Sequence, residues 1–175
     1  MFVIRDAKPK DARGIQEVFY RTWLATYPNQ KHGITLDDIE QRYIGYDSPE
    51  RIDRAAKRIT DLPANERFWV AEDSGEIVGV CHIVIEPDKN FLRAIYVLPQ
   101  YQGQGIGSAL MRRADGFFKP LVPSRVTVAT YNDRAIRFYE GLGFKKTDRV
   151  IVDEKFRMKS GSIITEIEMI RPPKA

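Results

Sequence analysis

The chain contains very few cysteines and histidines for its length. Among 175 residues there is one cysteine, Cys81, and there are two histidines. A single cysteine excludes an intrachain disulfide and fits a reducing compartment. The sequence also lacks any run of five like charges, and its formal net charge is only +4. A charge so mild and so dispersed does not indicate a nucleic-acid partner.

Long uninterrupted hydrophobic stretches are absent as well. The uncharged segment from Ala94 to Met111 has roughly the length of a membrane span, but proline, glutamine and glycine interrupt it. Charged residues near the N-terminus argue against a secretory signal: Arg5, Asp6, Lys8 and Lys10. We therefore expect a cytoplasmic protein without a membrane partner. The length and the ordinary apolar content of 43% favour a single domain, assigned to residues 1–175.

Strand-like and helix-like patterns follow one another along the chain without an internal repeat or a linker. Alternating or apolar segments predict strands at residues 2–5, 67–72, 77–86, 90–97 and 125–130, from 144 onward, and at 162–170. Capping residues and helical periodicity predict helices at about 9–26, 36–44, 49–61, 106–117 and 133–142. The turn at residues 73–76 predicts an antiparallel hairpin. The order indicates an α+β fold, with helices on both faces of one mostly antiparallel sheet.

A glycine-rich stretch follows the predicted strand 90–97. Glycine stands at Gly103, Gly105 and Gly107, directly before a helical pattern. Such a turn presents backbone N–H groups at a helix N-terminus, where a phosphate group binds readily. A P-loop is excluded because no lysine follows Gly107. A dinucleotide fingerprint fits poorly, since the next strand ends at Thr130 rather than at an acid. A turn with glycines for packing alone remains an alternative.

Two segments together resemble the motifs of the GNAT superfamily, the acyl-CoA-dependent N-acyltransferases. The segment LRAIYVLPQYQGQGIGSALM, residues 92–111, resembles the acyl-CoA-binding motif of that family, and YNDRAIRFYEGLGF, residues 131–144, resembles its second motif. The matching positions are Gln102, Gly105 and Gly107 in the first motif, and Asn132, Ala135, Tyr139 and Gly141 in the second. The resemblance implies a GNAT-like fold in which two central strands splay apart.

The resemblance also implies acetyl-CoA as cosubstrate and no metal. Backbone groups of Ile95, Tyr96 and Val97 would pair with the pantetheine arm as an added strand does. The pyrophosphate would lie on the turn and helix start formed by Gln102, Gly103, Gln104, Gly105, Ile106, Gly107 and Ser108. Asn132, Ala135 and Tyr139 would complete the cofactor site.

Transfer of an acyl group to an amine needs a neutral amine and an acid for the leaving thiolate. A backbone N–H near Val97 would polarise the thioester carbonyl. The resemblance makes Tyr139 the acid, and the alternative is a core aromatic residue. The glutamate that many relatives carry at the start of the motif strand is missing here, since the chain reads Asn90-Phe91-Leu92-Arg93. His82 is then the candidate base, and a water relay is the alternative. Cys81 is rejected as a nucleophile because it points away from His82.

The acceptor pocket is expected between the first two helices. The region offers aromatic and acidic residues that suit a cationic amine: Trp23, Tyr27, Asp37 and Asp38. The two acids could instead favour the helix dipole. We expect an enzyme that acetylates a primary amine of a small molecule, a polyamine, a peptide or a protein. The alternative is a non-catalytic acyl-CoA-binding regulatory module, and the sequence leaves a homodimer open.

Overall fold

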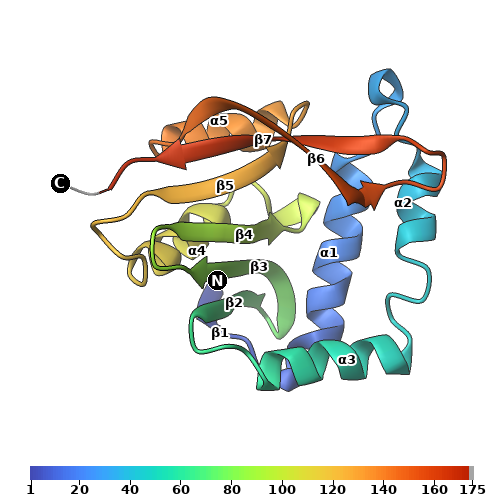
Figure 1. The fold of residues 1–175 in the computed structure, drawn as a ribbon. Helices are drawn as coiled ribbons and strands as arrows, with labels where there is room; N and C mark the ends of the chain where they lie inside the picture. Colours follow the sequence, from blue (N-terminus) through green and yellow to red (C-terminus); the bar gives the residue numbers. More distant parts are fainter. Residues whose placement is uncertain (174–175) are drawn as a thin grey trace.

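The computed structural model describes residues 1–173 and shows one seven-stranded sheet, with strand order β1-β2-β3-β4-β5-β7-β6 (Figure 1). All neighbouring strands are antiparallel except β4 and β5, which are parallel. The strands are β1 (Phe2–Asp6), β2 (Glu66–Asp73), β3 (Glu76–Ile85), β4 (Asn90–Val97), β5 (Ser124–Ala129), β6 (Lys145–Arg157) and β7 (Ile163–Arg171).

Five α-helices lie within residues 1–173, on both sides of the sheet and beyond one end of it (Figure 1). They are α1 (Ala12–Thr26), α2 (Leu36–Arg42), α3 (Pro49–Thr60), α4 (Ile106–Asp115) and α5 (Asp133–Gly141). Helices α1 and α4 both contact β3 and β4, from opposite faces of the sheet (Figure 1). The fold class predicted from the sequence is therefore confirmed, while the assignment of 1–175 to one domain stays a prediction.

Local signals place these elements where the sequence pattern predicts them. Thr35 caps α2 by accepting a hydrogen bond from the Asp38 N–H, and Ser48 caps α3 in the same way at Arg51. Ser74 and Gly75 turn the β2–β3 hairpin with positive φ angles of 51° and 85°. Glycine accepts this left-handed conformation without steric cost, so the predicted hairpin forms.

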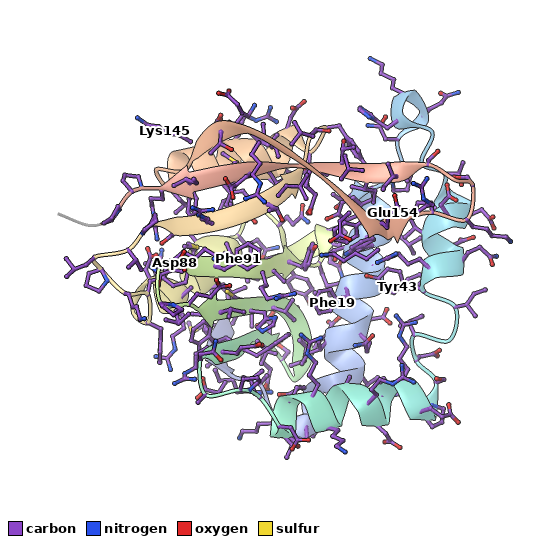
Figure 2. All side chains as sticks on the ribbon, viewed as in Figure 1. Phe19, Tyr43, Asp88, Phe91, Lys145 and Glu154 are labelled. Carbon is purple, nitrogen blue, oxygen red and sulfur yellow. The ribbon has the colours of Figure 1, made fainter. Side chains whose placement is uncertain are left out.

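Two hydrophobic clusters hold the layers together. The larger one joins α1, α4 and α5 to the strands, and its fully buried residues include Trp69, Leu110 and Met111. The second lies between α1, α2 and the end of the β5–β7 pair, and it is rich in aromatic rings. Phe19 and Tyr43 are labelled on this side of the sheet in Figure 2. Among residues 1–173, no helix is both long and apolar enough to span a membrane.

Candidate active site

The sheet is open at its centre, between β4 and β5. These two strands pair only from Asn90 to Leu92, opposite Ser124 to Val126. The register of β3 against β4 shifts after His82, because Ala94 faces His82 whereas Leu92 faces Ile83. Arg93 is therefore the extra residue of a β-bulge, at the point where the parallel pairing stops. Because a bulge bends its strand and increases the local twist, it accounts for the divergence of β4 from β5 (Figure 1).

A cavity of about 470 Å³ fills the gap between the diverging strands. Its walls come from α1, the open stretch of β4, the glycine turn, β5 and α5. Most of the predicted cofactor residues line it, namely Ile95, Tyr96, Val97, Gln102, Gly103, Gly105, Gly107, Ser108, Asn132, Ala135 and Tyr139. Gln104 and Ile106 do not line it. The Gln104 side chain donates to the Gln100 carbonyl, and Ile106 is buried in the core.

The open edge of β4 offers backbone groups to this cavity. The Leu98 N–H donates to the Val78 carbonyl of β3. Because residues of an antiparallel strand alternate between hydrogen-bonded and non-hydrogen-bonded positions, Tyr96 pairs with β3 whereas Ile95 and Val97 turn their N–H and C=O groups toward β5. The prediction that Ile95 and Val97 bind an added strand fits this geometry. Tyr96 contributes its side chain rather than its backbone.

The glycine turn leaves backbone donors free. Gly103 and Gly105 have φ angles of 83° and 82°, and a Cβ atom built on either meets nothing within 4 Å. Within the described chain, the N–H groups from Gly103 to Ser108 have no hydrogen-bond partner. They surround the N-terminus of α4, where the helix dipole favours an anion. This cradle fits the pyrophosphate of a CoA-type ligand, because the absent side chains leave the space that the phosphate oxygens would occupy.

The Gln102 side chain connects the turn to β4. Its amide donates to the Val97 carbonyl at 2.8 Å, which fixes the turn against the end of the open strand. Asn132 has a similar positioning role, because its side chain caps α5 by accepting from the Ala135 N–H. Both residues therefore hold the backbone that lines the cavity.

Tyr139 reaches the cavity from α5. Its ring is 6% exposed and packs edge-on against Phe144, with the ring centres 5.8 Å apart. Among residues 1–173, nothing bonds its hydroxyl, which faces the cavity. Burial raises the pKa of this phenol well above 10, and the charge of nearby groups adds to the effect. Tyr139 is thus protonated at neutral pH, as an acid must be.

Two further tyrosines, Tyr27 and Tyr96, form another part of the cavity wall. The hydroxyls of Tyr27 and Tyr96 lie 3.3 Å apart, and both residues line the cavity. Phe19 of α1, labelled in Figure 2, packs edge-on against Tyr96 with centroids 5.3 Å apart. Burial raises the pKa of both phenols. Of the residues predicted for the acceptor pocket, Tyr27 is the one that the structure places at the cavity.

Trp23, Asp37 and Asp38 do not line the cavity. The Trp23 ring is buried, and the Arg42 guanidinium already lies over it at 5.0 Å from the ring centre. Asp38 is 2% exposed and accepts hydrogen bonds from Thr35 and from Ser160 in the β6–β7 connection. Asp37 is exposed in the first turn of α2. Their geometry matches the alternative that the sequence left open, in which the acids stabilise the helix start.

His82 lies outside the cavity as well. Its Nε2 is 2.6 Å from a Glu66 carboxylate oxygen of β2, and its ring stacks on Phe68. Burial, the largest effect, lowers the pKa of the histidine, although Glu66 partly opposes this. The structure therefore places His82 in a buried cross-strand pair, not beside the reacting groups. Cys81 is fully buried, and burial raises its thiol pKa, so it is no nucleophile at neutral pH.

Four residues that the sequence reasoning did not select also belong to this region. Arg93, Thr127 and Arg134 line the cavity. Glu166 of β7 is half-buried and is the diagonal neighbour of Thr127 across the β5–β7 pair. The signal for Glu166 is present in the pattern of β7, where two glutamates occupy successive positions on one face of a mostly apolar strand.

Comparison with known proteins gives a consistent result. Residues 64–146 match the family model described as an acetyltransferase (GNAT) domain. The chain is 36% identical over 110 residues to N-acetyltransferase family 8 member 2 of Rattus norvegicus, covering 58% of this chain and 49% of that protein. It is 34% identical over 91 residues to the peptidyl-lysine N-acetyltransferase YiaC of Escherichia coli, covering 52% of this chain and 58% of that one. The chain thus spans about half the length of the curated relatives it matches.

Solved structures extend the likeness to the whole fold. The PaiA N-acetyltransferase of Thermoplasma acidophilum, crystallised with coenzyme A, superposes with a TM-score of 0.75. The match covers 98% of this chain and 99% of that chain at 23% sequence identity. At this identity the comparison establishes the shared fold.

Proposed function

We propose that the chain is an acetyl-CoA-dependent N-acetyltransferase, because residues 64–146 match the acetyltransferase (GNAT) family model and the fold matches that of a solved N-acetyltransferase. The acceptor is a primary amine. One observation carries the proposal: an unpaired strand edge, a cradle of free N–H groups and a protonated tyrosine all open into one cavity.

The residues of this cavity have separate roles in the proposed reaction. Ile95 and Val97 bind the pantetheine amides along the open edge of β4, and the turn from Gly103 to Ser108 binds the pyrophosphate. Acetyl-CoA, when bound, supplies the acetyl group as a thioester. The Val97 N–H, turned toward the gap, polarises the thioester carbonyl. Tyr139 donates its proton to the thiolate as the carbon–sulfur bond breaks.

The acceptor approaches from the tyrosine wall on the other side of the gap. Tyr27 and Tyr96 provide ring faces and hydroxyl oxygens that suit an ammonium group. One relative is named a peptidyl-lysine N-acetyltransferase. We therefore include a lysine side chain in a peptide among the proposed acceptors, together with polyamines and other small amines.

The experiment measures thiol release from acetyl-CoA with spermidine, with a peptide that carries one lysine and blocked termini, and with a peptide that has a free N-terminus. Thermal unfolding with and without CoA is measured in parallel, because a ligand that binds the native state raises its stability. Turnover with an amine supports the enzyme. A CoA-induced shift without turnover would favour the non-catalytic module, and the absence of both would refute the proposal.

A further inference from the structure

The cavity lacks an evident base. Among residues 1–173, no histidine and no carboxylate lines it. Its four tyrosines cannot take a proton at neutral pH. Burial raises the pKa values of Tyr27, Tyr96 and Tyr139 above 10, and the hydrogen bond to Glu76 raises the pKa of Tyr101. Yet an alkyl ammonium has a pKa of about 10.4, so at pH 7 roughly one acceptor in a few thousand is neutral. A group close to the cavity must therefore accept this proton if the reaction is to proceed at a useful rate.

Glu166 is a carboxylate on β7, the strand that pairs with β5 beside the cavity. It stands on β7 opposite Ala129, at the end of β5 where the sheet is open. Its neighbour Thr127 lines the cavity. After burial, which is the main cause, the charge of Glu166 also contributes to the raised pKa values of Tyr27, Tyr96 and Tyr139, three of the four tyrosines that line the cavity. One carboxylate thus acts electrostatically on Tyr27 and Tyr96 of the acceptor wall and on Tyr139 across the gap.

Glu168, the next glutamate on the same face of β7, differs from Glu166 because both of its partners are arginines. Glu168 pairs with Arg125 at 3.1 Å and with Arg149 at 3.5 Å. Within residues 1–173, Glu166 has no such ion pair, and Thr127 is its diagonal neighbour on the same face of the β5–β7 pair. A half-buried carboxylate that forms no ion pair keeps its oxygen lone pairs free to accept hydrogen bonds from a cationic ligand.

We propose, on the basis of the proposed function, that Glu166 binds the ammonium group of the acceptor and acts as the general base that deprotonates it. The proton passes from the ammonium nitrogen to a carboxylate oxygen of Glu166, directly or through one water. The neutral nitrogen then forms its bond to the acetyl carbon, and the carbon–sulfur bond breaks. Tyr139 protonates the sulfur and regains its proton from the new amide nitrogen. Glu166 finally releases its proton to solvent, so atoms and charges balance.

Burial and the neighbouring charged groups change the pKa of Glu166. Burial raises its pKa above the ordinary 4.5, while Thr127 and Lys155 favour the charged form and Asp153 opposes it. Arg42 of α2 lies over the Trp23 ring and donates to the Lys155 carbonyl, so it adds a positive charge on the side of the aromatic cluster. A carboxylate with a raised pKa is a stronger base than an exposed one.

The test compares the full-length wild type with Glu166→Gln, which keeps the shape of the side chain and removes the base. Thiol release with spermidine and with the blocked lysine peptide gives kcat/KM between pH 5.5 and 9.5. The wild type should show an acid limb and then a plateau. Glu166→Gln should lose about 10²–10³-fold at pH 7.5 and then gain about tenfold per pH unit, because it uses only the neutral amine.

Glu168→Gln is the matched control, because it makes the same substitution two residues further along the same face of β7. It should lower the thermal stability, because Arg125 and Arg149 lose their partner, but keep the plateau. Thr127→Val is a second test, since loss of the hydroxyl should move the acid limb to higher pH.

Three outcomes decide the proposal. A rising profile in Glu166→Gln, with an unchanged CoA-induced thermal shift, supports the base. A wild-type-like plateau and acid limb in Glu166→Gln overturns the base while leaving the proposed function intact. A wild type that releases no thiol with any tested amine overturns the proposed function, and the base with it.

Discussion

Removing one oxygen atom from Tyr139 is the sharpest test of the proposed acid. The ring of Tyr139 packs edge-on against Phe138 at 5.4 Å and against Phe144 at 5.8 Å between ring centres. Tyr139→Phe keeps both contacts. Among residues 1–173 the hydroxyl has no hydrogen-bond partner, so the loss of stability should stay below about 1 kcal/mol.

The catalytic effect of the same substitution should be much larger. Burial raises the pKa of the Tyr139 phenol, so the proton is present at neutral pH and available to the departing thiolate. Loss of a general acid lowers a rate about 10²–10⁴-fold, which corresponds to roughly 3–5 kcal/mol in the barrier. Because the proton is needed as the carbon–sulfur bond breaks, kcat and kcat/KM should fall together.

The assay is thiol release with the best acceptor from the amine panel, together with thermal unfolding in the presence of CoA. Tyr46→Phe is the control, since its hydroxyl donates to Glu17 and its side chain does not line the cavity. That variant should retain normal turnover. Full activity in Tyr139→Phe would refute the acid assignment, although the acyl-CoA site would stand.

Three further predictions concern the turn, the buried pair and the helix cap. Gly105→Val or Gly107→Val should abolish the CoA-induced thermal shift, and Gly105→Val should also lower the stability of the free protein because φ is 82° there; an unchanged shift would refute the pyrophosphate site. His82→Asn should retain transfer and lose thermal stability, because Glu66 loses its partner; a rate loss of about 10³-fold with CoA binding preserved would instead make His82 the base. Burial opposes ionisation of Asp38, but hydrogen bonds from Thr35 and Ser160 outweigh it and lower the pKa from 3.8 to about 2. The Asp38 carboxylate therefore stabilises the fold above pH 4 and loses this effect as the pH falls toward 2, so Asp38→Asn should show a shallower decline of Tm over that interval; an unchanged Tm with a raised KM would point to acceptor binding.

The sequence predicted the fold well where local chemistry decides it. The alternation in residues 77–86 placed Cys81 and His82 on opposite faces of β3, and the structure has them so, with Cys81 in the main core and His82 beside Glu66. Thr35 and Ser48 predicted the starts of α2 and α3, because each side chain caps the helix that follows it. A cap or a two-residue period acts over a few residues and can be read directly.

Side-chain partners across strands could not be predicted in the same way. The partner of His82 is Glu66 on the neighbouring strand, and its identity depends on the β2–β3 register. Asp38 is held by Ser160, which is 122 residues away along the chain. Glu166 and Glu168 are equivalent in the pattern of β7, and only the arginines of β5 and β6 distinguish them. Such contacts depend on tertiary placement, which one sequence does not encode locally.

The opening between β4 and β5 explains how the proposed acid can reach the sulfur while the proposed base reaches the amine in the same reaction. Tyr139 belongs to α5, which lies on the same face of the sheet as α4 (Figure 1). Glu166 and Tyr27 lie on the other face, with Ala129 and the aromatic cluster of α1 and α2. A continuous sheet would separate these groups by a layer of paired backbone. Because the Arg93 bulge ends the pairing after Leu92, the cavity joins the two faces, and a thioester in the gap meets the proton donor from one side and the amine from the other.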